Sequence, residues 1–267
     1  MPESPLQTPR VTLITEAYNL SEGQSEASFV RALQTVLQIG QRYPDVEVIV
    51  LDPTHEHVAQ PILAARFPQL KALHVPGMTY DGQKNAAARA AQGEFLGFLD
   101  GDCVPQSERW LETLLAPFEQ PHVQAVGGLT VYEGDDVTSR AMTVMDFGYL
   151  FEPNAQGHLG CYASNNVAFR RAAYRSVMAP DDGVMRCYCY KHAQLLARAG
   201  MPVHANHAAK VFHELPDVRK ERLRRGFDHA AALWEDPVLA GGARIALDDA
   251  YIESVMPCLL NSFFSVE

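Results

Sequence analysis

Two aspartates separated by one glycine, Asp100 and Asp102, are the residues whose spacing points most directly to chemistry. They follow the apolar run 95–99, which has the length and aromatic content of a strand buried on both faces. Ligands of open α/β sheets bind beyond the carboxyl ends of the strands, where paired carboxylates suit a hard divalent cation. The alternative is an ordinary turn whose aspartates bond to loop amides, because Asp and Gly are common turn residues.

Three further apolar runs precede this strand, and helical stretches separate the runs. The expected strands are residues 11–15, 46–51, 70–75 and 95–99. The expected helices are residues 29–37, with Ser28 as the N-cap, 62–66 and 84–91, and residues 77–82 are expected to form a loop. This alternation is typical of a doubly wound parallel sheet, whose right-handed crossovers bring the strand exits to one edge. We therefore expect Asn19, Asp52 and the acidic pair to converge there.

The second half of the chain has a less regular pattern. It is expected to contain helices at residues 110–118, 138–151 and 191–198 and extended segments at residues 123–131, 161–170 and 203–212. A basic stretch at residues 217–234 is expected to be helical. The tail at residues 251–264 is apolar enough to dock on the domain or to contact a membrane or another protein.

Composition narrows the class of protein. The chain has 267 residues, of which 47% are hydrophobic, enough for one large domain or two small ones. A net charge of −10 gives no general support for a nucleic-acid partner. Five cysteines form no zinc-type pair, and their odd number argues against a disulfide framework. No signal region and no apolar run of roughly 18 residues is present, so we expect a cytoplasmic protein whose tail could bring it to a membrane.

Together these pieces resemble the family 2 glycosyltransferases, which have the GT-A fold, a Rossmann-like open mixed sheet flanked by helices. The resemblance runs from about Val11 to Gly226 and depends on the order of short motifs. These motifs are residues 11–19, 47–52, 82–85, 91–94, 98–102, 164–171, 199–200 and 211–213. The resemblance implies a domain over residues 1–215, with a nucleotide-sugar-binding half (10–104) and an acceptor half (105–215). Residues 216–267 would form a helical extension packed on it.

The resemblance also implies roles for residues at the predicted edge. Asp102 would coordinate Mn²⁺ or Mg²⁺ against the donor diphosphate, Asp100 would touch the ribose or the metal shell, and His213 would add a metal ligand. A divalent cation suits this chemistry because the leaving nucleoside diphosphate gains negative charge. The donor, expected to be a UDP- or GDP-sugar, would contact Ala17, Tyr18, Asn19, Asp52, Lys84 and Asn85. Without the resemblance, His213 would be interpreted as an ordinary loop histidine.

Three positions depart from the family pattern. Glu16 stands where the first strand normally continues into proline, and Asp52-Pro53 replaces a pair of aspartates. The usual Glu-Asp base motif, about eleven residues before Ala199-Gly200, is replaced by Tyr188-Cys189. Neither tyrosine nor cysteine is a ready base at neutral pH. The remaining candidates for the base are Asp181, Asp182 and His192.

The leading hypothesis is a metal-dependent, hexosyltransferase-like enzyme that moves a sugar from a nucleotide-diphosphate-sugar to an acceptor hydroxyl. Its product would belong to polysaccharide, glycolipid or other glycoconjugate synthesis. The alternative is a non-catalytic sugar-nucleotide-binding protein of the same fold that has lost the general base. A nucleotidyltransferase is disfavoured, because it would carry a Gly-rich basic loop directly after the first strand. Residues 16–19 at that place contain no glycine and no basic residue.

Overall fold

The computed structural model describes residues 10–21, 25–43, 45–70, 72–181 and 188–215. The expected basic helix, the C-terminal extension and the base candidate Asp182 lie outside the described residues. Within the described part, no helix is both long enough and apolar enough to cross a membrane.

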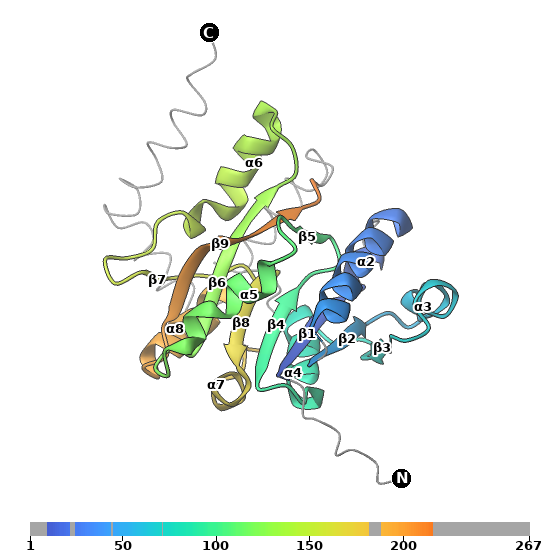
Figure 1. Cartoon of the computed structure of the whole chain (residues 1–267), viewed down its shortest axis with the longest axis horizontal. Coiled ribbons are helices and arrows are strands. Elements are labelled where there is room, and N and C mark those ends of the chain that lie inside the picture. Colours follow the sequence, from blue (N-terminus) through green and yellow to red (C-terminus); the bar gives the residue numbers. More distant parts are fainter. Residues whose placement is uncertain (1–9, 22–24, 44, 71, 182–187, 216–267) are drawn as a thin grey trace.

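The first half forms the parallel part of the sheet, as predicted. Its strands are β1 (Val11–Glu16), β2 (Val46–Asp52), β3 (Ala72–His74) and β4 (Phe95–Leu99). They lie side by side in the order β3-β2-β1-β4, and every pair is parallel (Figure 1). The helices between them are α1 (Tyr18–Ser21), α2 (Glu26–Arg42), α3 (Ala59–Arg66) and α4 (Tyr80–Ala90). All five residues of β4 are buried, which confirms the strand inferred from the apolar run.

Helices α2, α3 and α4 all begin earlier than the sequence predicted. Ser28 is not the N-cap of α2, because the hydroxyl of Ser25 accepts a hydrogen bond from the Ser28 N–H at 3.1 Å. Helix α4 starts inside the predicted loop, because the Thr79 hydroxyl accepts from the N–H of Gly82 at 3.0 Å. The earlier start puts Tyr80 and Lys84 one turn apart on the same helix.

The second half completes a mixed sheet of nine strands among the described residues. Its strands are β5 (Cys103–Pro105), β6 (Ala125–Tyr132), β7 (His158–Leu159), β8 (Asn166–Arg170) and β9 (Val203–His213). Beyond β4 the order continues β8-β6-β9-β5, with β7 also paired to β9. Strand β8 is antiparallel to β4, and β9 is parallel to β6 but antiparallel to β5. In this register His213, at the end of β9, lies opposite Cys103.

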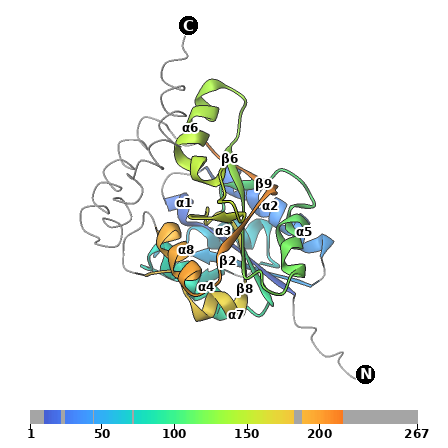
Figure 2. The same cartoon turned by 90° about the vertical axis from the view of Figure 1, so that its left-hand side faces the viewer.

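Helices cover both faces of this sheet (Figure 2). The helical elements of the second half are α5 (Trp110–Leu115), η1 (Ala116–Glu119), α6 (Val137–Phe147), η2 (Gly148–Leu150), α7 (Arg171–Ser176) and α8 (Tyr188–Arg198). One core cluster joins β1 and β4 to α2 and α5 through residues such as Leu13, Val36 and Trp110. The cluster on the other face joins Phe98 of β4 to α4, α7 and α8. The turn after β4 is thus held between two packed layers.

Candidate active site

The acidic pair lies in the short turn between β4 and β5. The backbone N–H of Cys103 donates to the carbonyl oxygen of Asp100 at 3.1 Å and closes this turn. Gly101 passes so close to β1 that a Cβ there would overlap the carbonyl oxygen of Glu16. The glycine between the two aspartates is therefore required by packing, and it brings the end of β1 against the turn.

Asp100 is engaged by α4. The Lys84 ammonium lies 2.6 Å from Asp100 Oδ1, and the two side chains are only 5% and 7% exposed. Tyr80, one turn earlier on α4, donates its hydroxyl to the other oxygen of Asp100. Lys84 also lies 4.6 Å from the centroid of the Tyr80 ring, which adds a cation–π contact. The resemblance implied that Lys84 contacts the donor, and in the structure Lys84 is paired with Asp100.

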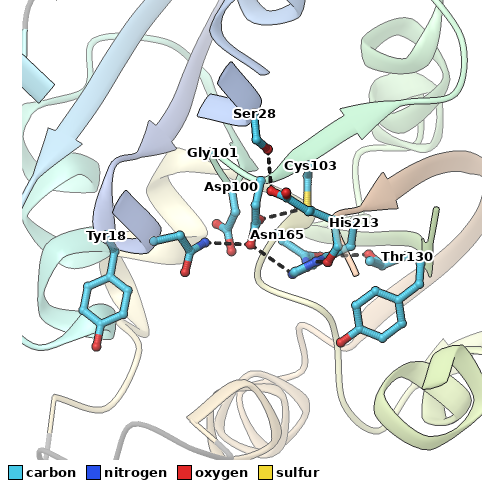
Figure 3. A network of polar contacts seen from close by, with 12 residues as sticks. Tyr18, Ser28, Asp100, Gly101, Cys103, Thr130, Asn165 and His213 are labelled. Carbon is cyan, nitrogen blue, oxygen red and sulfur yellow. Dashed lines mark hydrogen bonds and ion pairs between the residues drawn. The ribbon is translucent and has the colours of Figure 1, made fainter. Parts of the chain in front are cut away.

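Asp102 faces away from Lys84 and Tyr80, toward the end of β9. Its Oδ2 accepts a hydrogen bond from Asn19 Nδ2 at 2.7 Å and lies 3.3 Å from His213 Nε2. Its Oδ1 lies 3.5 Å from the Cys103 sulfur. Figure 3 shows Asp100, Cys103 and His213 gathered at this end of the sheet. The structure thus brings together Asn19, Asp102 and His213, although His213 is 111 positions further along the chain than Asp102.

The orientation of the His213 ring is set by its neighbours. Its Nδ1 lies 2.7 Å from the carbonyl oxygen of Glu214, which can only accept, so Nδ1 carries the proton. The ring packs edge-on against Tyr132 and also contacts Phe147. These contacts aim Nε2 at Asp102, 3.3 Å from its Oδ2. A metal-binding histidine is commonly fixed by this kind of contact through its second nitrogen.

Glu16 is a site residue that sequence reasoning noted only as a departure from the family pattern. Its carboxylate, at the end of β1, accepts from the N–H of Tyr18, from Asn19 Nδ2 at 3.3 Å and from the N–H of Gly101 at 3.4 Å. Burial, together with the negative charges of Asp100 and Asp102, raises the pKa of Glu16 to about 8. An acidic residue directly after the short β-branched run at residues 11–15 was the signal available in the sequence.

This end of the sheet is suited to a cation. Glu16, Asp100 and Asp102 supply three carboxyl groups, and Lys84 forms an ion pair with Asp100. Burial raises the pKa of Asp102, His213 opposes the rise, and Asp100 adds to it. One oxygen of Asp102, the Cys103 sulfur and one nitrogen of His213 lie within 4.8 Å of one another. Carboxylate and imidazole are acceptable ligands for Mn²⁺, so this donor set fits a divalent cation.

The residues predicted to hold the nucleoside lie at the same edge but are differently engaged. Ala17 is buried and its N–H donates to the Leu51 carbonyl at 2.8 Å. The Tyr18 ring packs edge-on against Tyr80. Asp52 is buried, its Oδ1 accepts from the Thr54 N–H and hydroxyl, and its Oδ2 accepts from the N–H of Ala59. In this structure Asp52 therefore holds the loop after β2 and the start of α3.

Asn85 does not reach the site. Its amide nitrogen donates to the carbonyl oxygen of Ala179 at 2.9 Å, and its amide oxygen accepts from the Tyr174 hydroxyl at 3.1 Å. Both contacts are buried. Asn85 thus fastens α4 to α7 and the segment that follows it, and the contact with the donor that the resemblance implied is not supported by this arrangement.

The base candidates are scattered. His192 is fully buried, with Nε2 bonded to the Val177 carbonyl and Nδ1 to the Tyr162 hydroxyl, each at 2.7 Å. Burial lowers its pKa to about 4. These contacts correct the prediction for His192, because a ring with both nitrogens engaged inside the core cannot face an acceptor.

Asp181 remains accessible. It is exposed, and its Oδ1 accepts from the Thr79 hydroxyl at 2.6 Å, beside the first turn of α4. Tyr188 and Cys189 lie at the start of α8. Tyr188 is buried with its ring edge-on to Tyr80, and burial raises the pKa of Cys189 to about 11. Neither is poised to take a proton.

Solved structures share this fold. The structure is similar to that of the mannosyltransferase PcManGT from Pyrobaculum calidifontis in complex with GDP-Man and Mn²⁺, with a TM-score of 0.61 and 17% identity. That likeness covers 98% of this chain and 89% of the mannosyltransferase. The structure of GalNAc-T7 with UDP, GalNAc and Mn²⁺ is similar with a TM-score of 0.57 and 12% identity, over 79% of this chain and 44% of that one. The sheet and its flanking helices are therefore those of the GT-A glycosyltransferases.

The comparison of sequences agrees with the comparison of structures. A search of curated proteins gave no match. The sequence model described as glycosyl transferase family 2 matches residues 12–178, which is more than half of the chain. The matched span includes the acidic pair, Lys84 and the end of β1, whereas His213 lies beyond it. The chain belongs to glycosyl transferase family 2.

Proposed function

We propose that this chain is a metal-dependent glycosyltransferase that moves a hexose from a nucleotide-diphosphate-sugar to an acceptor hydroxyl. The observation that carries the proposal is the placement of Asp102 against His213, next to the buried Asp100–Lys84 pair. The similar structures contain GDP-Man with Mn²⁺ in one case and UDP, GalNAc and Mn²⁺ in the other. These ligands support a GDP- or UDP-sugar as the donor and Mn²⁺ or Mg²⁺ as the cation.

The roles follow from the contacts. Asp102 and His213 would hold the cation, and Asn19 orients Asp102 through its hydrogen bond to Oδ2. When bound, the cation supplies Lewis-acid stabilisation of the charge that develops on the leaving nucleoside diphosphate. Lys84 offsets the charge of Asp100, which limits the repulsion between the two carboxylates of the turn. The nucleoside would lie along the ends of β1 and β2, near Ala17 and Tyr18.

We assign to Asp181 the role of general base, which takes the proton from the acceptor hydroxyl. It is the exposed carboxylate among the candidates that the structure describes, and Thr79, which bonds it, directly precedes Tyr80 and its contact with Asp100. An exposed carboxylate beside such a site can accept a proton as the acceptor oxygen attacks. The buried Tyr188 and Cys189 favour a second candidate function, sugar-nucleotide binding without transfer, because no acid stands at their position.

One experiment separates the two functions. Purified protein is mixed with Mn²⁺ and a panel of GDP-, UDP- and TDP-sugars, and both nucleotide binding and release of nucleoside diphosphate are measured. Transfer or hydrolysis in the wild type supports the enzyme, and binding without either supports the binding protein. Asp181→Asn is expected to keep binding and lose turnover, whereas Asp102→Asn loses both. Asp135→Asn, in an exposed loop, is the matched control.

A further inference from the structure

Cys103 directly follows the acidic pair and has no role in the function proposed above. Its side chain is fully buried, and its register partner across the β5–β9 ladder is His213. Its sulfur lies 3.5 Å from Asp102 Oδ1. Among the described residues, Asp102, Cys103 and His213 are the single group of three such side chains whose ligand atoms all lie within 4.8 Å of one another.

The ligand atoms of the three side chains face one another. With Nδ1 donating to the Glu214 carbonyl, His213 Nε2 faces Asp102 Oδ2 at 3.3 Å, and its lone pair can bind a cation in the neutral ring. The Cys103 thiol donates to the other carboxylate oxygen of Asp102. A carboxylate oxygen, an imidazole nitrogen and a sulfur resemble the three protein ligands of many catalytic metal sites.

We propose that Cys103 is a third protein ligand of this cation and that it shifts the preference of the site from Mg²⁺ toward softer ions, with Co²⁺ and Zn²⁺ ahead of Mn²⁺. The inference rests on the proposed function, because it concerns the same cation. Mg²⁺ prefers oxygen ligands, whereas thiolate favours softer ions. On binding, the metal–sulfur bond replaces the S–H bond, and the thiol proton is released to solvent.

The contact of Cys103 with Asp102 bears on this preference. The Cys103 thiol donates to Asp102 Oδ1 at 3.5 Å, so a cation that binds the sulfur must displace the thiol proton from this contact. A soft divalent ion can do so, because a coordinating thiol is deprotonated outright. Mg²⁺, which prefers oxygen ligands, would bind through Asp102 and His213 alone.

Cobalt titration of the full-length chain tests the inference without any assay of transfer. Wild-type protein is expected to develop the near-ultraviolet charge-transfer band of a sulfur–cobalt bond as Co²⁺ is added. Cys103→Ser and Cys103→Ala should lose the band, and their affinity for Co²⁺ relative to Mg²⁺, measured by calorimetry, should fall at least about tenfold. Cys161→Ser, which removes a half-buried thiol bonded to the Tyr162 carbonyl, is the control and should keep the band. Circular dichroism checks that each variant is folded.

Each outcome distinguishes this inference from the proposed function. If Co²⁺ binds and the band and the ion preference persist in both Cys103 variants, Cys103 is not a ligand, and the proposed metal site stands. If the wild type binds neither Co²⁺ nor Mn²⁺ nor Mg²⁺, the metal site itself fails. If Asp102→Asn abolishes Co²⁺ binding while the Cys103 variants lose only the band and the preference, both proposals are supported.

Discussion

The Nε2 atom of His213 lies 3.3 Å from Asp102 Oδ2, and the other ring nitrogen is committed to the carbonyl of Glu214. The two side chains are 13% and 11% exposed, so little water screens them. Two acceptors held this close repel each other unless a proton or a metal ion lies between them. The N–H of Glu214 in turn donates to the carbonyl oxygen of Asp102 at 3.0 Å, so the backbone fixes both partners in this position.

Removing either ligand should therefore weaken cation binding more than it weakens the fold. We expect Asp102→Asn and His213→Gln each to lower the affinity for Mn²⁺ by at least about 10- to 100-fold, measured by calorimetry. His158→Gln changes a histidine on β7, which pairs with the opposite end of β9, and serves as the control. An unchanged affinity in Asp102→Asn would exclude the proposed metal site.

The buried pair of Lys84 and Asp100 should behave differently. Lys84→Met leaves the Asp100 carboxylate buried without its cation, and we expect a loss of about 3–5 kcal/mol in the free energy of unfolding, measured with denaturant. The double variant Lys84→Met with Asp100→Asn should recover a large part of that loss, because no charge is then left unpaired. Breaking the exposed Arg31–Glu133 pair with Arg31→Met is expected to have a far smaller effect, since solvent screens it. Equal losses of unfolding free energy in Lys84→Met and Arg31→Met would contradict this account.

The sequence predicts the parallel half well because its signals are local. The buried run of β4 and the acidic turn after it lie within a few residues of each other, and crossover rules place neighbouring strand ends at one edge. The approach of His213 to Asp102 depends on the pairing of β9 with β5, which no local pattern encodes; only the resemblance suggested it. His192 illustrates the opposite case. Its position on α8 fits either a base or a packing residue, and only the tertiary contacts with Val177 and Tyr162 decide between them.

Glu16 should make the metal-free protein less stable as the pH rises. Its pKa is about 8 in the folded chain and near 4.5 in the unfolded chain, so between these values the folded state holds a proton that the unfolded state has lost. The stabilisation is complete below the lower value and is lost on the way to pH 8, at up to about 1.4 kcal/mol per pH unit. Glu16→Gln should flatten this slope. Denaturant unfolding in EDTA from pH 5 to about 8.5 measures it, and parallel curves for the two proteins would refute the assignment.

His192 should contribute a slope of the opposite sign at lower pH. Its pKa is about 4 when folded and about 6.5 when unfolded, so the unfolded chain binds the extra proton between these values. The stabilisation from the neutral ring is complete above about pH 6.5 and is lost as the pH falls toward 4. We expect His192→Gln to be less sensitive to acid in this interval, whatever its stability at neutral pH. Tyr162→Phe removes the hydrogen bond to Nδ1 but keeps the imidazole, so it should retain the acid sensitivity of the wild type. Denaturant midpoints at pH 4.5, 5.5 and 6.5 compare the three proteins, and an unchanged slope in His192→Gln would show that the acid sensitivity arises elsewhere.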